Sequence, residues 1–508
     1  MRVLTAAEAR EADRAAIEGY GIPGLLLMEH AARAVADAAR ELLAPAGRVV
    51  VVAGAGNNGG DGYAAARLLF VAGVLVHVVA VGDPARLRGD AAENAAMWTR
   101  IGGRTEPFAS RALEGLGPGD VVIDALFGTG LAREPEGDWA AAIDAVNDAR
   151  VRGAGVVAVD LPSGLSADTG RPLGAVVEAD VTVTFGTLKR GHVLHPGATL
   201  AGRVRVADIS LPPDVLAGLA PEVRLLDEAH VRGLLPPRRA DTHKGTFGHC
   251  LVLAGSFGKS GAAALAAKAA LVGGAGLASV ATRAGAIDAV LGHAMEIMGV
   301  PLEGAGPLAL ADAPALLDAL EGKAALLAGP GIPRGEETGA LLRRLLAAAS
   351  CPVVLDADAL NALAGGGPIE ASTEVVVTPH PGEMARLAGI STADVQADRI
   401  GVAQRFARGN RCTVVLKGAH TVIADPDGTV AICPTGNAGM ATGGSGDVLG
   451  GLVAALLSQG HPAAAAARVG VFVHGLAGDL RAAARGQAGL VAGDLLDGIA
   501  EVWATWSR

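Results

Sequence analysis

Short apolar runs rich in valine, isoleucine and leucine, most of which end in glycine or aspartate, recur along this chain and constrain its fold. In the first half they occupy residues 48–54, 74–82, 120–128, 156–162, 179–185 and 203–209, and helical patterns lie around 5–19, 24–43, 59–72, 86–101 and 136–149. Because most runs are continuously apolar, they indicate strands buried on both faces. The alternation predicts a mostly parallel sheet with helices on both sides.

A second alternating series follows a proline-bearing stretch at 212–238. Its predicted strands are 249–254, 324–328, 352–356, 374–378, 412–417 and 420–424. At about 150 residues per domain, 508 residues are compatible with two to four domains. We therefore expect an α/β protein of two domains, 1–215 and 225–508, each built as three αβα layers.

Composition excludes several classes of partner. A formal net charge of −10 and an aromatic content of 3% disfavour binding to nucleic acid. The chain contains no charge-free apolar run of 18 residues, so no membrane span is predicted. The four cysteines lack C-x-x-C spacing, which indicates reduced thiols rather than a zinc site. The N-terminus lacks signal-peptide features, and Thr5 and Glu8 have capping-box spacing, so we expect a cytoplasmic protein whose first helix begins there.

The glycine-rich turn at residues 54–59 matches G-x-G-x-x-G between a predicted strand and a predicted helix, and Asp83 ends the next strand. This pattern predicts a Rossmann-like first domain. The turn continues, however, through Gly60, Asp61 and Gly62. A carboxylate here would repel a pyrophosphate in the usual pose, whereas it could hold a hydroxyl group or a cation. Hydride transfer is therefore disfavoured.

Oxygen-bearing side chains follow two further strands of the first half, namely Asp124, Asp160 and Ser163. In open α/β sheets the ligand crevice lies outside the carboxyl ends of the strands. Asn58, Asp124 and Ser163 could converge there on one hard cation. The alternative is that each aspartate only caps a turn.

The glycine-rich segment 436–446 precedes Asp447 and the helical pattern at 448–457. Glycines at a helix start leave backbone N–H groups directed outward at the positive end of the helix dipole, which favours an anion. Asp447 would not attract phosphate. We expect it to take a proton from a hydroxyl group that attacks phosphorus, the alternative being a charge at a helix start.

A near match to a P-loop lies at residues 253–260, but Leu253 replaces its first glycine. We interpret it as a small-residue substrate loop and keep P-loop chemistry as a weaker alternative. Further fragments at predicted strand ends fit phosphoryl transfer without a P-loop: residues 329–331, 356–360, 378–383 and 417–421. The last contains Lys417, which could meet a nucleotide phosphate.

The motifs, taken in order, resemble those of bacterial bifunctional NAD(P)H-hydrate repair enzymes. Residues 57–62, 124–131 and 160–164 resemble the epimerase domain, and the fragments of the second half resemble the ribokinase-like dehydratase domain. The resemblance implies that the R and S forms of hydrated NADH or NADPH (NAD(P)HX) interconvert in the first domain. It further implies that the second domain dehydrates the S form with ADP or ATP. There Asp447 deprotonates the ring hydroxyl, which takes the terminal phosphoryl group, and the ring nitrogen then expels phosphate.

The resemblance also implies site residues. In the epimerase domain NAD(P)HX would contact Asn57, Asn58, Gly59, Gly60, Asp61, Gly128, Thr129, Gly130, Leu131, Ala132, Arg133, Glu134 and Asp160. Potassium would be held by Asn58, Asp124 and Ser163, with Asp160 as the acid/base and Lys189 as a structural residue or, alternatively, a helper. In the dehydratase domain the hydrate would contact Ala262, Gly331, His380 and Asp447, although His380, next to prolines, could alternatively be only a turn residue. The nucleotide would contact Lys417, Gly418, Ala419, His420, Thr421, Asn437, Ala438, Gly439, Met440, Ala441, Thr442, Gly443, Gly444, Ser445 and Gly446.

Ala438 stands where the family usually has proline, which gives the loop more backbone freedom. Magnesium is expected with the nucleotide, although no ligand set stands out, and a homo-oligomer is expected from the family. Two alternatives remain. The first domain could be only a nucleotide-binding module, and the second could be a vitamin or sugar kinase that releases a stable phosphorylated product. The residues do not distinguish ADP from ATP or NADHX from NADPHX.

Overall fold

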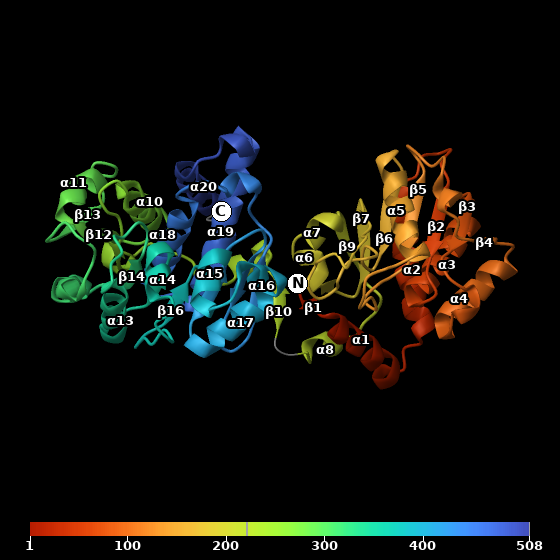
Figure 1. The fold of residues 1–508 in the computed structure, drawn as a ribbon, viewed down its shortest axis with the longest axis horizontal. Coiled ribbons are helices and arrows are strands. Elements are labelled where there is room, and N and C mark those ends of the chain that lie inside the picture. The colour runs from red at the N-terminus through yellow and green to blue at the C-terminus, as the bar shows by residue number, and fades with distance from the viewer. Residues whose placement is uncertain (220–221, 507–508) are drawn as a thin grey trace. The chain divides into compact units, whose positions relative to one another are not determined.

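The computed structural model describes residues 1–219 and 222–506, and the chain divides into two compact units between Glu222 and Val223 (Figure 1). The helices of the first unit are α1 (Ala6–Arg14), α2 (Gly24–Leu42), α3 (Asn57–Val71), α4 (Gly89–Arg100), α5 (Asp138–Val151), α6 (Arg190–Val193), α7 (Gly197–Leu200) and α8 (Pro213–Ala217). Its strands are β1 (Val3–Leu4), β2 (Val49–Ala53), β3 (Val76–Ala80), β4 (Thr105–Pro107), β5 (Val121–Ala125), β6 (Gly155–Val159), β7 (Val181–Phe185), β8 (Leu188–Lys189) and β9 (Arg203–Ala207).

Seven strands of the first unit form one sheet in the order β4-β3-β2-β5-β6-β7-β9, and every pairing is parallel. All residues of β2 and β5 are buried, because α2, α3 and α4 pack over one face of the sheet and α5 over the other. The prediction of a Rossmann-like three-layer domain is confirmed. The strand order reverses between β2 and β5, and a ligand crevice forms at such a switch point.

The second unit contains the remaining elements. Its helices are α9 (Glu228–Arg232), α10 (Ser260–Val272), α11 (Ala284–Leu291), α12 (Ala313–Leu320), α13 (Thr338–Ala348), α14 (Ala357–Leu363), α15 (Pro381–Ala388), α16 (Thr392–Ala397), α17 (Arg399–Asn410), α18 (Ser445–Ser458), α19 (Ala463–Arg485) and α20 (Ala492–Trp506). Its strands are β10 (Val223–Leu225), β11 (His249–Leu253), β12 (Leu277–Arg283), β13 (Met298–Leu302), β14 (Ala325–Ala328), β15 (Val353–Leu355), β16 (Val375–Val377), β17 (Thr413–Leu416), β18 (Thr421–Ala424) and β19 (Val430–Cys433).

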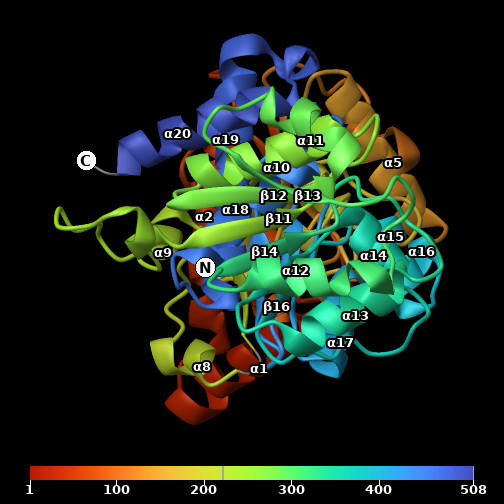
Figure 2. The ribbon, with the colours of Figure 1, turned by 90° about the vertical axis from the view of Figure 1, so that its left-hand side faces the viewer.

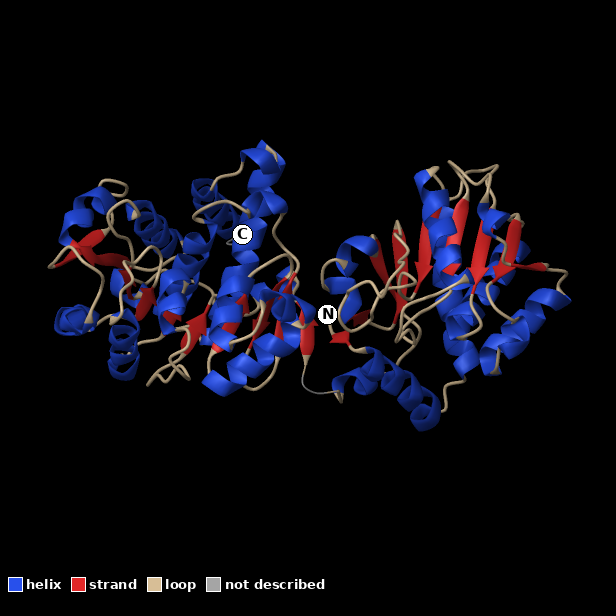
Figure 3. Ribbon diagram, viewed as in Figure 1, coloured by secondary structure: helices blue, strands red, loops and turns tan. Residues whose placement is uncertain are grey.

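These strands form one sheet in the order β10-β19-β18-β17-β16-β15-β14-β11-β12-β13. Only β18 runs antiparallel to its neighbours, β17 and β19. Helices α10, α18, α19 and α20 bury a large apolar cluster against one face, and α12 and α13 lie on the other side of the strands (Figures 2 and 3). The order reverses at the β11–β14 pair, so the carboxyl ends of β11, β14 and β15 border the expected crevice.

Sequence analysis missed several strands, among them β4, β12 and β13. β13 lies at the sheet edge with four of its five residues not buried, which removes the apolar signal. In β12, buried Ser279 and Thr282 interrupt the apolar run. The first helix begins at the predicted capping box of Thr5 and Glu8, but its α-helical part ends at Arg14. Among the described residues, no helix is long and apolar enough to cross a membrane.

Candidate active sites

A cavity of about 180 Å³ lies at the carboxyl ends of the strands in the first unit. Four of the predicted epimerase residues line it: Asn57, Asp61, Thr129 and Asp160. They come from the start of α3 and from the loops that follow β5 and β6, which is where the switch-point rule places a ligand. The cavity is also lined by Lys189 and by residues of the N-terminal segment that sequence analysis had not assigned to the site.

Asp160 occupies an unusual backbone position at the end of β6. Its φ of 65° lies in the left-handed region, which a residue with a side chain rarely adopts. Two backbone hydrogen bonds hold it, because its N–H donates to the Val183 carbonyl over 2.8 Å and its own carbonyl lies 2.7 Å from His192 Nε2. His192 Nδ1 accepts from the Lys189 N–H over 3.0 Å, which leaves the proton on Nε2. The strained backbone therefore fixes the direction of the Asp160 side chain.

The Asp160 carboxylate is buried beside a lysine. Its Oδ1 accepts hydrogen bonds from Lys189 Nζ over 2.7 Å and from Thr184 Oγ1 over 3.0 Å. Burial alone would raise the pKa of Asp160, but the Lys189 ammonium, together with His192 and the Thr184 hydrogen bond, brings this pKa below its ordinary value. Burial lowers the pKa of neighbouring His192 to about 4, so that imidazole is neutral. The site thus holds an ionised carboxylate, which can accept a proton.

Asp124 and Ser163 form a second buried polar pair. Ser163 Oγ donates to Asp124 Oδ1 over 2.6 Å, and the Ser163 N–H donates to Asp124 Oδ2 over 2.8 Å. Burial raises the pKa of Asp124 to about 6, and no lysine, arginine or histidine of residues 1–219 and 222–506 forms an ion pair with it. Asn58 Nδ2 is buried without a partner. A buried carboxylate without a cationic partner, beside an unsatisfied amide, fits a cation site.

The tandem glycines of the first turn serve packing. A Cβ at Gly59 would lie 1.9 Å from the Gly54 carbonyl oxygen, and one at Gly60 would lie 2.6 Å from Ala91 Cβ. Only glycine therefore lets the start of α3 approach β2 and α4 so closely. Both glycines are buried, whereas Asn57 and Asp61 reach the cavity.

The other predicted contacts of this unit lie nearby. Gly128 borders the site, since a Cβ there would lie 2.9 Å from Asn58 Oδ1 and 3.1 Å from Asp160 Oδ2. Residues 130–134 are partly or fully exposed, and only Thr129 of the loop lines the cavity. Asp83 stays exposed and accepts a hydrogen bond from the Ala85 N–H over 2.9 Å. It is a turn cap and does not line the cavity.

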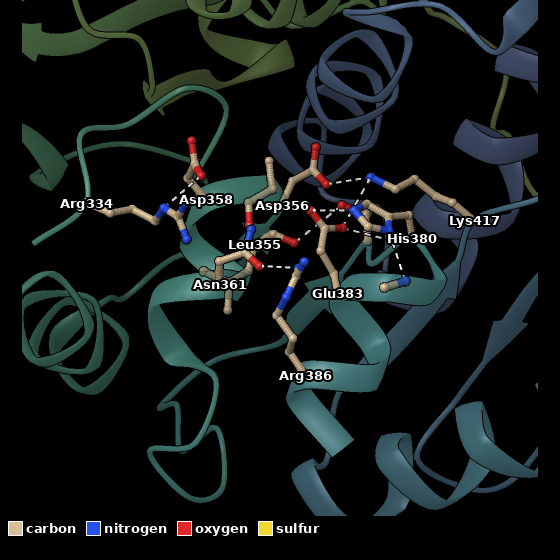
Figure 4. Close-up of polar contacts among 12 residues, drawn as sticks. Arg334, Leu355, Asp356, Asp358, Asn361, His380, Glu383, Arg386 and Lys417 are labelled. Carbon is tan, nitrogen blue, oxygen red and sulfur yellow. Dashed lines mark hydrogen bonds and ion pairs between the residues drawn. The ribbon is translucent and has the colours of Figure 1, made fainter. Parts of the chain in front are cut away.

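In the second unit, Lys417 at the end of β17 points toward two carboxylates, that of Asp356 after β15 and that of Glu383 in the first turn of α15 (Figure 4). Its Nζ lies 2.8 Å from Asp356 Oδ1 and 4.0 Å from Glu383 Oε2. Burial opposes the charge of Lys417, but the carboxylates of Asp356 and Glu383 raise its pKa above the ordinary value. A charged lysine at this place can bind phosphate oxygens.

Asp447 lies in the first turn of α18, which begins after Gly444 in the left-handed conformation (φ 92°). Burial and the nearby carboxylate of Asp356 raise the pKa of Asp447 to about 7, while the Lys417 ammonium opposes that rise. A Cβ at Gly446 would lie 3.3 Å from Lys417 Nζ, so the helix start and the lysine adjoin. A carboxylate that titrates near neutral pH suits a general base.

The loop that resembles a P-loop is fastened to the turn after β14. The Gly255 N–H donates to the Pro330 carbonyl over 2.7 Å, and Ser256 Oγ donates to the Gly331 carbonyl over 2.8 Å. Lys259, the lysine of the near match, instead lies 3.3 Å from Asp358. Phosphate binding of the P-loop type is therefore disfavoured.

Two predicted hydrate contacts, Ala262 and Gly331, are neighbours, since a Cβ at Gly331 would lie 3.2 Å from Ala262 Cβ. His380 begins α15, where its Nδ1 accepts from the Gly382 N–H over 3.0 Å and its Nε2 lies 3.5 Å from Glu383 Oε1 (Figure 4). The imidazole remains half exposed, so it caps the helix and can also contact a ligand.

Asp479 on α19 organises the glycine-rich loop. Its carboxylate accepts from the Gly436 N–H and from Asn437 Nδ2, each over 2.9 Å. Asn437 Oδ1 in turn accepts from the Gly439 N–H over 3.0 Å. These bonds order the backbone on both sides of Ala438 and so offset the freedom gained by the absence of proline.

Arg399 supports the other predicted nucleotide segment, residues 417–421. Its Nη2 donates to the Leu416 carbonyl over 3.0 Å and to the Lys417 carbonyl over 3.3 Å, and Thr421 Oγ1 donates to the Gly418 carbonyl over 3.0 Å.

The sequence assigns residues 356–360 and 378–383 to phosphoryl transfer, but it gives no separate role to Asp356 or Glu383. Nothing in the sequence marks Asp13 or Asp479. Within residues 1–219 and 222–506, no cluster of three or more His, Cys, Asp or Glu is arranged to hold a metal ion by itself.

The folds and sites define a two-domain α/β enzyme that handles small polar ligands and, in its second unit, phosphate. A family model described as YjeF-related protein N-terminus matches residues 24–191, and one described as NAD(P)H-hydrate dehydratase matches residues 250–501. The bifunctional NAD(P)H-hydrate repair enzyme of Moorella thermoacetica is 44% identical over 98% of this chain and 96% of its own length. That of Escherichia coli is 36% identical over 97% and 92%. The chain belongs to the family of bifunctional NAD(P)H-hydrate repair enzymes.

Solved structures resemble the second unit. The ADP/ATP-dependent NAD(P)H-hydrate dehydratase of Bacillus subtilis, co-crystallised with ATP and Mg²⁺, is 33% identical with a TM-score of 0.50, covering 56% of this chain and 99% of that chain. A ribokinase-like superfamily protein from Enterococcus faecalis is 25% identical with a TM-score of 0.50, covering 56% and 96%. The prediction of a ribokinase-like second domain is confirmed.

Proposed function

We propose that this enzyme repairs hydrated nicotinamide cofactors in two steps carried out by separate domains. Residues 1–215 interconvert the R and S forms of NAD(P)HX, and residues 225–508 dehydrate the S form with ADP or ATP. The proposal is supported by relatives of this name across the whole chain. The observation that carries it is Asp447, a carboxylate with a pKa of about 7 at a glycine-flanked helix start beside Lys417.

In the dehydratase domain, Asp447 takes the proton of the ring hydroxyl as that oxygen attacks the terminal phosphoryl group. Lys417 and the backbone N–H groups at the start of α18 stabilise the negative charge of the phosphates. The lone pair of the ring nitrogen then breaks the C–O bond and expels phosphate. Loss of a proton from the adjacent ring carbon restores the dihydronicotinamide. Asp447 and the phosphate-binding groups around it therefore convert the ring hydroxyl, a poor leaving group, into a phosphate ester, which leaves readily.

Magnesium would accompany the nucleotide and neutralise phosphate charge. The structure offers one donor that fits it, because Asp356 Oδ2 is buried without a partner beside the start of α18. A single carboxylate oxygen fits an ion that takes most of its ligands from phosphates and water.

In the epimerase domain, Asp160 moves the proton that inversion at the carbinolamine carbon requires, and Lys189 keeps it ionised. Asn58, Asp124 and Ser163 would hold potassium, which would supply the positive charge that the buried Asp124 lacks. We also propose a cytoplasmic location, because the four cysteines are buried and unpaired, as in a reducing compartment. We further propose that the protein forms a homo-oligomer, as the family resemblance implies.

The test is purified protein with mixed NAD(P)HX epimers, with and without ADP or ATP. The absorbance of reduced nicotinamide should return only with nucleotide and should reach completion with both epimers. Asp447→Asn should abolish the return of absorbance and leave epimer exchange intact. Asp160→Asn should abolish epimer exchange and leave dehydration of the S form intact. If the absorbance stops rising once one epimer is consumed, the first domain does not interconvert the two epimers. A stable phosphorylated product would show that the second domain is a kinase, and full exchange by Asp160→Asn would exclude Asp160 as the base.

A further inference from the structure

The N-terminal segment, residues 2–17, forms part of the wall of the epimerase cavity. Leu4 of β1, Asp13 of α1 and Ile17 line that cavity together with Asp160 and Lys189. Leu4, Asp13 and Ile17 lie before residue 24, where the matched family model begins. The motifs that carried the family resemblance therefore leave this wall unassigned.

The segment is fastened to the site by several contacts. β1 pairs in parallel with β8, which places Leu4 in register with Lys189. Thr187 Oγ1 donates to the Arg2 carbonyl over 2.6 Å, and Arg10 Nη1 donates to the Thr129 carbonyl over 3.3 Å. The helix that carries Asp13 is thus held to the strand that carries Lys189 and to the loop that contains Thr129.

Asp13 has the properties of a proton carrier. No hydrogen bond or ion pair engages its carboxyl group within the described part of the chain. Burial raises its pKa to about 6, the Lys189 ammonium opposes that rise, and the Asp160 carboxylate adds to it. The cavity therefore holds two carboxyl groups whose environments separate their protonation, since the pKa of Asp160 is lowered. Such a pair suits one acid and one base.

The other acidic groups of the cavity fit this role less well. Burial raises the pKa of Asp61 well above its ordinary value, and the carboxylates of Asp160 and Asp13 add to that rise. Asp90 also lines the cavity, but it comes from α4 and its carboxylate lies against Gly24, where a Cβ would come within 2.3 Å of Oδ2. The pKa of Asp13, in contrast, is raised only to about 6, which is close to neutral pH.

We propose that Asp13 is the second acid–base group of the epimerase and works as a pair with Asp160. This inference rests on the proposed function. Inversion at this carbon can proceed by loss of oxygen from one face and its return on the other, a route that needs a proton donor besides the ionised Asp160. Asp13 donates its proton to the hydroxyl of the carbinolamine carbon, the C–O bond breaks, and water departs as the ring-nitrogen lone pair forms the C=N⁺ bond.

A water molecule then adds to the other face of that carbon. Its oxygen forms the new C–O bond, the C=N⁺ electron pair returns to nitrogen, and Asp160 accepts the proton. One water leaves and one is gained, and the proton has passed from Asp13 to Asp160. In the reverse direction the two groups exchange roles. Before the next turnover in the same direction, Asp160 releases its proton to solvent and Asp13 takes one up, as the raised pKa of Asp13 and the lowered pKa of Asp160 favour.

The experiment measures exchange between R and S forms of NAD(P)HX without nucleotide, from pH 5 to 9. Asp13→Asn should lower kcat about 100-fold or more, with KM within a few-fold, and should remove one limb of the pH profile. Glu11→Gln, on the exposed side of the same helix, is the matched control and should keep the parent rate. Asp13→Glu should regain part of the activity.

Nucleotide-dependent dehydration of the S form, which the second unit carries out, should be unchanged in every variant, and the activity regained by Asp13→Glu reports on folding of the first unit. A parent rate and parent pH profile in Asp13→Asn overturn the assignment, as does a loss confined to KM. If the parent protein itself exchanges no epimers, the proposed function fails, and this outcome is distinct from failure of Asp13.

Discussion

Lys417 Nζ lies 2.8 Å from Asp356 Oδ1, while Oδ2 of the same carboxylate is buried without a partner. Gly446 and Gly450 of α18 face this free oxygen, since a Cβ at each would lie 3.9 and 3.6 Å from it. A half-satisfied carboxylate is costly inside a protein. At the edge of a phosphate site it therefore indicates a place for a cation that arrives with the nucleotide.

Replacing Asp356 tests this cation role. Asp356→Asn should raise the magnesium concentration for half-maximal dehydration about 10-fold or more, because the variant lacks the anionic ligand oxygen. The measurement is the initial rate of dehydration against magnesium at fixed nucleotide. Asp318→Asn on α12 replaces an exposed aspartate and serves as the control. An unchanged magnesium dependence would show that Asp356 only neutralises Lys417.

The dehydratase should depend on pH through Asp447. The group acts as a base, so it must be deprotonated, and its pKa is raised to about 7. The rate should therefore fall as the pH drops through about 7. Lys417→Met should move this inflection to higher pH, because the ammonium lowers the pKa of Asp447. Profiles of kcat/KM for the S hydrate measure both effects, and a flat profile between pH 6 and 8 would contradict the assignment.

Much of the fold and of both sites could be predicted from sequence because both depend on strand ends. Asp124, Asp160 and Lys417 each follow a short apolar run, and parallel strands bring their carboxyl ends together. Which strands are neighbours could not be read from the chain. Lys189 therefore stood apart as a possible helper, although it lies 2.7 Å from Asp160.

Asp13 and β13 show two further limits of sequence patterns. Asp13 lies on an ordinary amphipathic helix, and only the pairing of β1 with β8 brings that helix to the site. β13 lies at an exposed edge, where its residues carry no continuous apolar signal.

The glycines at the start of α3 should differ sharply in their tolerance of alanine. At Gly59 a Cβ would lie 1.9 Å from the Gly54 carbonyl oxygen, so Gly59→Ala must move α3 away from β2. We expect the free energy of unfolding of the first unit to fall by about 3 kcal/mol. Gly56→Ala is the matched control, because no atom lies within 4 Å of its Cβ position. Calorimetry of both variants measures the difference, and equal transition temperatures would contradict the close packing.

Potassium should stabilise the first unit through Asp124. An ion that binds only the folded state raises the transition temperature. We expect a rise of about 3 °C when KCl replaces choline chloride at a potassium concentration well above the dissociation constant. Asp124→Asn should abolish this increment because it lacks the buried charge, whereas Asp144→Asn, on the exposed side of α5, should retain it. An equal increment in Asp124→Asn would place potassium elsewhere.

Lys189 should set the pH range of epimerisation. Its ammonium lowers the pKa of Asp160 and opposes the rise in the pKa of Asp13, so Lys189→Met should raise both and move the whole profile to higher pH. At pH 5 the rate should fall about 10-fold, because an opposite charge in contact shifts a carboxyl pKa by about 1–3 units and Asp160 then becomes protonated. At pH 7, above the pKa of about 6 of Asp13, the rate should not fall. Lys189→Arg keeps the charge and should restore most of the original profile. Exchange rates of the two epimers against pH give the result. A uniform loss without a shift would mean that Lys189 only holds the Asp160 loop in place.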